Sequence, residues 1–119
     1  MPYVDAFVIP IPKKNLSAYR RMAQRAGVVW REHGAVEFRE CVGDDLLPKK
    51  VAWPFPRLAR LKRGETVLFS WIVFKSKAHR NRVNARVLKD PRVVKMMAEP
   101  MPFEGDRMTY GGFKTLVDL

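Results

Sequence analysis

The fold of this chain is decided by the stretch that runs from Glu65 to Phe74, ETVLFSWIVF. Nearly all of its residues are apolar, aromatic or β-branched, and such side chains predict a β-strand because they pack well on a pleated surface. Both faces of this strand are apolar, one with Val67, Phe69, Trp71 and Val73 and the other with Leu68, Ile72 and Phe74. A sheet with one face in water alternates apolar and polar residues instead, so we expect both faces to be covered.

Three more strands are predicted from similar runs, at Tyr3–Ile11, Val36–Val42 and Arg107–Val117. The last strand contains Gly111-Gly112, which indicates a bulge or a close approach of another group. Three prolines between Leu46 and Gly64 predict an extended central loop.

Apolar residues spaced by three and four predict a helix between Asn15, a good N-cap, and Gly34, a natural C-terminal stop. A second helix is expected from Ser76 or Lys77 to about Lys89, followed by a short helical turn through Met97. The order strand, helix, strand, strand, helix, strand predicts one α+β domain over residues 1–119. We expect a ferredoxin-like βαββαβ fold with a four-stranded antiparallel sheet and both helices on one face.

Two helices cover only one face of such a sheet, although both faces are apolar. The simplest cover for the second face is the same face of another copy, related by a two-fold axis. The sequence therefore predicts a homodimer through the sheet face, a dimeric α+β barrel.

The composition excludes several classes of protein. The chain has no apolar run long enough to span a membrane and no secretory signal, so we expect no membrane partner. Cys41 is the only cysteine, which rules out an internal disulfide and fits a reducing cytoplasm. One cysteine and two histidines do not make a closed zinc site, and there is no Gly-rich phosphate loop, so we expect neither a metal nor a cofactor.

The net charge of +11 raises the question of nucleic acid. The basic residues are spread over both helices and the central loop, which favours a solvated basic surface over a binding site. In the loop, Trp53 and Phe55 lie among basic residues and could stack on bases or clasp a partner subunit, and we favour the clasp. Nucleic-acid binding, if any, is expected to be weak and salt-dependent.

His33 is the first candidate for a catalytic residue. It continues the apolar stripe of the first helix, so we expect it to face the sheet at the end of a cavity. Its ordinary pKa lies near neutrality, which suits a general base. The alternative is a buried histidine that caps the helix end or bonds a carboxylate.

Arg80 and Asn84 lie inside the apolar sector of the second helix. A buried guanidinium is costly unless it is paired. We expect a carboxylate partner, chosen from Asp5, Glu40, Asp44 and Asp45. The alternative is an anion-binding arginine.

Polar or aromatic residues near these positions complete the candidate pocket. Asp5 and Ser70 interrupt apolar strands, and Trp30 and Trp71 are candidate walls. The candidate pocket residues are Asp5, Trp30, His33, Glu40, Ser70, Trp71, Arg80 and Asn84.

Several stretches resemble the YbaA-like family of uncharacterised bacterial proteins. They are Pro2–Asp5, Trp30–Ala35, Glu40–Asp45, Phe69–Val73 and Arg107–Phe113. The resemblance implies a dimeric α+β barrel and a homodimer, but it implies no reaction. The central loop departs from the family pattern at Trp53-Pro54-Phe55-Pro56.

Three functions remain open from the sequence. The first is binding of a small molecule in a pocket between sheet and helices. By analogy to cofactor-independent oxygenases and isomerases of this fold, such a protein could be an enzyme. The second is a binding or regulatory protein without catalysis. The third is weak association with nucleic acid through the basic surface.

Overall fold

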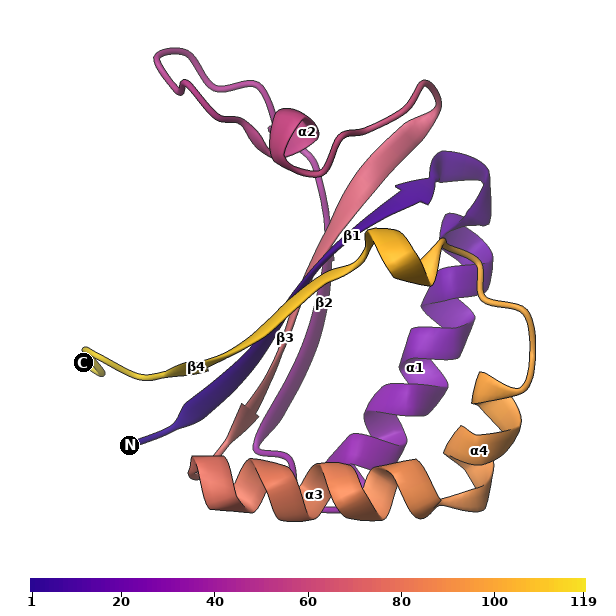
Figure 1. The fold of residues 1–119 in the computed structure, drawn as a ribbon, viewed down its shortest axis with the longest axis vertical. Coiled ribbons are helices and arrows are strands. Elements are labelled where there is room, and N and C mark those ends of the chain that lie inside the picture. The colour runs from indigo at the N-terminus through magenta and orange to yellow at the C-terminus, as the bar shows by residue number, and fades with distance from the viewer.

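The computed structural model describes residues 1–119 and contains a four-stranded antiparallel sheet with helices on one face (Figure 1). The strands are β1 (Tyr3–Pro12), β2 (Glu37–Val42), β3 (Glu65–Phe74) and β4 (Thr109–Lys114), in the order β2-β3-β1-β4. The helices are α1 (Leu16–Glu32), the single turn α2 (Phe55–Leu58), α3 (Lys77–Lys89) and α4 (Pro91–Met97), with 3-10 turns η1 (Lys13–Asn15) and η2 (Gly105–Arg107). The predicted ferredoxin-like α+β arrangement is confirmed.

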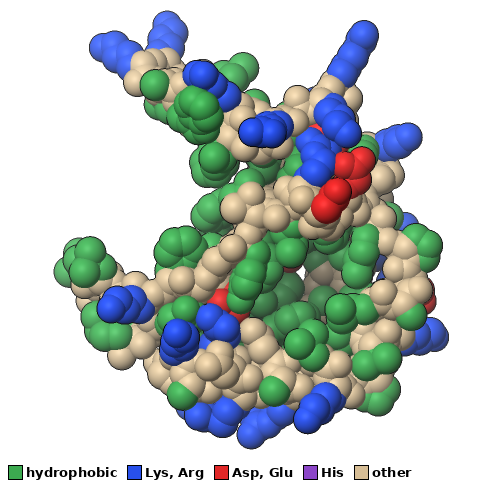
Figure 2. All heavy atoms as spheres, viewed as in Figure 1, with side chains coloured by type: hydrophobic (Ala, Val, Ile, Leu, Met, Phe, Trp, Pro, Cys, Tyr) green, Lys and Arg blue, Asp and Glu red, His purple; other side chains and the backbone are tan.

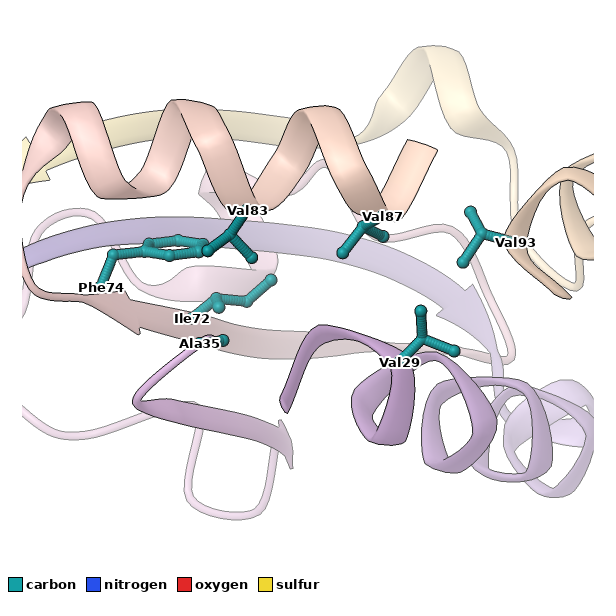
Figure 3. Packing of buried hydrophobic residues seen from close by; sticks show 7 residues of the cluster. All are labelled: Val29, Ala35, Ile72, Phe74, Val83, Val87 and Val93. Carbon is teal, nitrogen blue, oxygen red and sulfur yellow. The ribbon is translucent and has the colours of Figure 1, made fainter. Parts of the chain in front are cut away.

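The strand register assigns each side chain to a face of the sheet. Asp5 lies opposite Ile72 and Phe7 lies opposite Ser70, so these side chains share one face. On this face, Ile72 and Phe74 pack with Val83 and Val87 of α3, in a seven-residue cluster that Val29, Ala35 and Val93 complete (Figure 3). Each buried side chain of this kind stabilises the fold by about 1.5–3 kcal/mol. Packing of α1 and α3 on this face therefore fixes the frame of the site.

The ends of α1 show one confirmed and one wrong expectation. Gly34 follows the helix with a φ of +115°, a conformation that glycine adopts without strain. Asn15 does not cap the first turn with its side chain, which instead donates to the carbonyl oxygen of Pro102 at 2.9 Å. An N-cap needs an extended backbone, whereas Asn15 has φ −98° and ψ 1° because η1 leads directly into the helix.

The last strand is shorter than predicted. It starts at Thr109, because the chain before it forms η2, where Arg107 is held by Glu65 through a 2.7 Å contact. The pairing with β1 continues through Gly111 and Gly112 without a bulge. Gly112 is a place of close approach, since a Cβ there would lie 2.4 Å from the Tyr3 hydroxyl and 2.6 Å from the Arg80 guanidinium.

The other face of the sheet, which we call the open face, is left mostly uncovered by this chain, although α2 meets it where Phe55 contacts Phe69. Its apolar side chains are Val4, Ala6 and Val8 of β1, Val67, Phe69, Trp71 and Val73 of β3, Cys41 of β2 and Phe113 of β4, and β2 adds the charged Glu37 and Arg39 at the edge. Phe69 and Phe113 are 39% and 59% exposed. Helices α1, α3 and α4 lie on the opposite side (Figure 1). None of them is long and apolar enough to cross a membrane.

Candidate functional site

An apolar pocket lies between the helix-covered face of the sheet, α1, α4 and the segment that follows α4. Its volume is about 210 Å³, and 16 of its 18 lining residues are hydrophobic. Figure 2 shows a hollow with hydrophobic side chains on its walls between the sheet and these helices. The aromatic and methionine residues that line it are Phe7, Tyr19, Trp30, Phe38, Phe103, Met22, Met96, Met97, Met101 and Met108, with Trp71 at its border.

The pocket contains one carboxyl group, that of Glu40. The side chain comes from β2 and faces the helices, because Glu40 pairs with Ser70 across the sheet. The hydroxyl of Tyr19 donates to Oε2 of Glu40 at 2.7 Å. No basic residue lines the pocket or forms an ion pair with this carboxyl.

Burial has a clear effect on the proton affinity of this pair. Removal from water raises the pKa of Glu40 above its ordinary 4.5, while hydrogen bonds with Tyr19 and Ser70 oppose the shift. Burial, followed by the Glu40 carboxylate, raises the pKa of Tyr19 far above 10, so the phenol keeps its proton. Glu40 is therefore the group in the pocket that can accept and release a proton, and Tyr19 holds it in place.

The pocket has one rigid and one adaptable wall. The floor is sheet, with Phe7, Ile9 and Ile72 fixed by strand pairing. The rim carries every methionine of the chain except Met1. Methionine side chains are flexible and polarisable, and they make favourable contacts with aromatic rings. Such a rim can follow the outline of more than one apolar ligand.

Four of the candidate residues form a polar chain behind the pocket wall. Nε of Arg80 lies 3.3 Å from Oδ1 of Asp5, whose side chain is 1% exposed. Asn84 donates to Oδ2 of Asp5 at 3.3 Å and accepts a 3.0 Å bond from Nε1 of Trp30. The expectation of a carboxylate partner for Arg80 is confirmed, and the partner is Asp5 rather than Glu40. Through Trp30, this chain reaches the apolar pocket.

The ion pair is held by charge rather than by hydrogen-bond geometry. Nε of Arg80 and Oδ1 of Asp5 are buried and make no hydrogen bond despite their proximity. The guanidinium also donates to the Tyr3 hydroxyl at 3.0 Å and stacks on that ring. The Asp5 carboxylate neutralises Arg80, so the pair is a structural link between β1 and α3 and a poor anion site.

His33 does not line the pocket, so the prediction that it lies at the end of the cavity is wrong. It is the C-cap of α1, and its side chain is 28% exposed. Nε2 of His33 lies 2.9 Å from Oδ2 of Asp90, the residue that caps α4. The apolar stripe ends before this residue because regular helix stops at Glu32, and the carboxylate of Asp90 holds the ring at the helix junction. The alternative, a buried helix-end histidine bonded to a carboxylate, is confirmed for the carboxylate bond and wrong for burial, because the side chain stays partly exposed.

Trp71 also differs from the expected pocket wall. It borders the pocket, but its indole lies on the open face, where Nε1 donates to Glu37 at 3.1 Å and the ring stacks near Phe69. Trp30, Glu40 and Ser70 do line the pocket. The structure thus divides the candidates into a pocket group, the Asp5 ion-pair group and the isolated His33.

Sequence reasoning missed Tyr19 and the methionines. Tyr19 lies on the apolar stripe of α1, and a buried tyrosine hydroxyl usually finds a partner, which was the available signal. Met101 and Met108 lie outside regular helix and strand, where no periodicity points to a wall. No group of three or more histidine, cysteine, aspartate or glutamate side chains is arranged to hold a metal ion.

Comparison with known proteins places the chain in a family. It is 41% identical over 118 residues to the uncharacterized protein YbaA of Escherichia coli K12, covering 99% of each chain. In structure it is similar to SnoaB, a cofactor-independent oxygenase from Streptomyces nogalater, with a TM-score of 0.56 and 14% identity over 99% and 96% of the two chains. It is equally similar, at a TM-score of 0.56 and 9% identity over the full length of both chains, to a dimeric ferredoxin-like protein from an uncultured marine organism. The DUF1428 family, proteins of unknown function, matches residues 2–105. The resemblance to YbaA-like proteins is confirmed, and the chain belongs to the DUF1428 family.

Proposed function

We propose that the protein binds a small, mostly apolar molecule in the apolar pocket and that Glu40 exchanges a proton with it. The observation that carries this proposal is one carboxyl of raised pKa, bonded to Tyr19, within walls that are otherwise almost entirely apolar. Catalytic carboxyl groups acquire such pKa values in the same way, by burial without a counter-charge.

The residues that line the pocket limit the class of ligand that it can bind. A carboxylate without a neighbouring cation repels anions, so the ligand is neutral when it enters. Aromatic and methionine walls favour a planar, unsaturated molecule, since sulfur and ring contacts are both best with aromatic partners. An O–H or an activated C–H of that molecule gives its proton to Glu40, and the electron pair stays on the ligand. Such a proton transfer would suit an isomerase or an oxygenase that needs no cofactor, and the structural neighbour SnoaB is a cofactor-independent oxygenase.

The test uses 1-naphthol and naphthalene as probes, which share a ring system but differ in the hydroxyl. A bond from the hydroxyl to an ionised carboxylate is stronger than one to a neutral group. Binding of 1-naphthol, measured by calorimetry, should therefore strengthen as pH rises through the pKa of Glu40, while binding of naphthalene should not change. Glu40→Gln should remove this pH dependence. Glu37→Gln, on the same strand but on the open face, is the matched control and should keep it. A wild-type affinity for 1-naphthol that does not vary with pH would contradict the proposal.

The same pocket would serve a binding protein without catalysis, which is the alternative. That protein would bind the neutral ligand and release it unchanged. Exchange of ligand protons with deuterium from solvent, followed by mass spectrometry, separates the two: wild type incorporates deuterium at an activated C–H and Glu40→Gln does not. Incorporation at equal rates in both proteins would leave Glu40 without a role.

We further propose that the protein is a homodimer through its open face. Phe69, Trp71 and Phe113 form an apolar surface there that the chain leaves mostly uncovered, with a contact from Phe55 of α2 to Phe69. A structural neighbour is named as dimeric, which supports this assembly. Light scattering at micromolar concentration should give twice the monomer mass of 13.8 kDa. The lone Cys41 suits a reducing compartment, in line with a cytoplasmic location.

A further inference from the structure

The connection between β2 and β3, residues 43–64, projects from the body of the molecule, and we call it the arm. Figure 1 shows it extending away from the helices, with α2 near its middle. The radius of gyration is 15.2 Å, against about 13.5 Å for a compact chain of this length. Part of this excess reflects the projection of the arm, which contacts its own body mainly near its base.

The arm carries large apolar side chains that are in water in a single copy. Leu47 is 75% exposed, Trp53 is 57% exposed and Leu58 is 50% exposed. Scattered apolar residues are ordinary on protein surfaces, whereas several on one projecting segment mark an interaction site. These side chains need a partner with apolar surface.

The apolar surface of the arm continues into the open face. Phe55 of α2 meets Phe69 of β3 edge to face, with ring centroids 6.0 Å apart. Phe69 points away from α1, α3 and α4, so the arm and the open face meet on the same side of the sheet. A body that covers the open face therefore also lies beside the arm.

We infer that the arm packs against a second copy of this chain, the copy that covers the open face, and this inference rests on the proposed homodimer. A two-fold axis makes the contact reciprocal, so that each arm reaches over the body of the other subunit. The arm is shaped before assembly: Arg57 donates to the carbonyl oxygen of Ala52 at 3.2 Å, and Pro54 and Pro56 restrict the backbone around α2. Little ordering entropy is then lost on contact.

The details of the arm favour a protein partner over nucleic acid. The guanidinium of Arg57 covers the Trp53 ring at 3.9 Å, so that face is not free to stack on a base. Leu47 and Leu58 are aliphatic and have nothing to offer a base edge or a phosphate. The basic side chains of the arm, Lys49, Lys50, Arg60, Lys62 and Arg63, suit a solvated rim around this apolar centre.

The experiment compares two double variants by sedimentation equilibrium. Leu47→Ser with Trp53→Ser removes apolar contacts from the arm without touching the buried core. Leu88→Ser with Val94→Ser, two exposed residues on α3 and α4, is the matched control. The arm variant should raise the monomer–dimer Kd at least about tenfold, and the control should leave it near wild type.

A cross-linking measurement gives a second readout that does not depend on affinity. A photo-reactive benzoylphenylalanine takes the place of Trp53 in a mixture of unlabelled and nitrogen-15-labelled protein. Cross-linked peptides that join a labelled to an unlabelled copy are the expected result. Cross-links found only within one copy would overturn the inference.

The experiments distinguish a failure of the proposed homodimer from a failure of the role proposed for the arm. A monomeric wild type would overturn both the homodimer and the role of the arm. A dimer whose Kd is unchanged in the arm variant would overturn the role of the arm alone. A variant that dimerises normally but loses binding to duplex DNA at about 150 mM salt would show that the arm serves nucleic acid instead.

Discussion

Replacement of Arg80 by alanine should destabilise the fold strongly. The change leaves the Asp5 carboxylate, 1% exposed, with the Asn84 amide at 3.3 Å and the Tyr110 hydroxyl as polar partners but with no counter-charge. Removing one member of a buried ion pair costs about 3–5 kcal/mol, because a buried charge loses its counter-charge. The Arg80 side chain keeps 19% of its surface exposed, so water can enter where it leaves. We therefore expect the lower end, a loss of about 3 kcal/mol in the free energy of unfolding.

The assay is thermal and urea unfolding at one fixed protein concentration, because a dimer has a concentration-dependent Tm. An unfolding entropy of about 2.1 cal/mol/K per residue converts about 3 kcal/mol into a Tm lower by roughly 12 °C for a chain of 119 residues. Arg86→Ala is the matched control on the same helix, where the side chain is exposed and forms no ion pair. Its effect should stay within about 0.5 kcal/mol.

A double variant tests the cause of the loss. If the cost comes from the uncompensated carboxylate, Asp5→Asn in the Arg80→Ala background should restore part of the stability, because a neutral amide needs no counter-charge. An Arg80→Ala protein that melts within about 2 °C of wild type would refute the reasoning. So would a double variant that is less stable than Arg80→Ala alone.

Four further predictions concern the pKa shifts and the close approach at β4. Tyr19→Phe removes a hydrogen bond that lowers the pKa of Glu40, so carboxyl NMR should show the Glu40 midpoint at higher pH, and an unchanged midpoint would contradict the bond. Burial raises the pKa of Glu40 above 4.5, so the folded state still binds a proton at pH values where the unfolded chain has released it. The free energy of unfolding should therefore fall as pH rises through the pKa of Glu40 in the folded state. Urea unfolding of Glu40→Gln should not show this loss. Hydrogen bonds from Arg92, then His33, hold the pKa of Asp90 well below its usual range. Asp90→Asn should therefore be less stable than wild type at neutral pH, with the difference shrinking as acid protonates the wild-type carboxylate below about pH 3.9. Gly112→Ala should lower the Tm, since the new methyl would lie 2.6 Å from the guanidinium that pairs with Asp5; an unchanged Tm would show that this guanidinium moves freely.

The fold was predictable because its signals are local. The period-two pattern of Glu65–Phe74 and the period of the first helix each depend on residues close in sequence, and strand β3 has the predicted bounds. The pairing of Arg80 was predictable for a different reason, since an unpaired guanidinium in an apolar sector is too costly to persist. Arg80 therefore needs a carboxylate partner, and the sequence offers four candidates. Only the folded structure shows that Asp5 is the carboxylate beside the Arg80 guanidinium.

His33 could not be placed by the same means. Helical periodicity assigns it to the apolar face only while the helix continues, and the helix ends one residue earlier. The contact that then holds it comes from Asp90, 57 residues later in the chain. The sequence predicts only a short helical turn after α3, and this prediction does not indicate that the Asp90 carboxylate bonds to His33.

Several polar side chains occupy inward positions of the sheet, and three of them differ in what surrounds them. Asp5, Glu40 and Ser70 all break the rule that inward strand positions are apolar, and such breaks concentrate at functional sites. Asp5 has a guanidinium beside it, so its charge is matched and its position is explained by structure. Glu40 has only the neutral hydroxyls of Tyr19 and Ser70 as partners, and their hydrogen bonds do not offset the rise in its pKa that burial causes. A carboxyl without a counter-charge, facing a pocket of apolar walls, has no structural role that an apolar residue would not fill better. This contrast between the two carboxyl groups is the physical reason to look for the activity of the protein at Glu40.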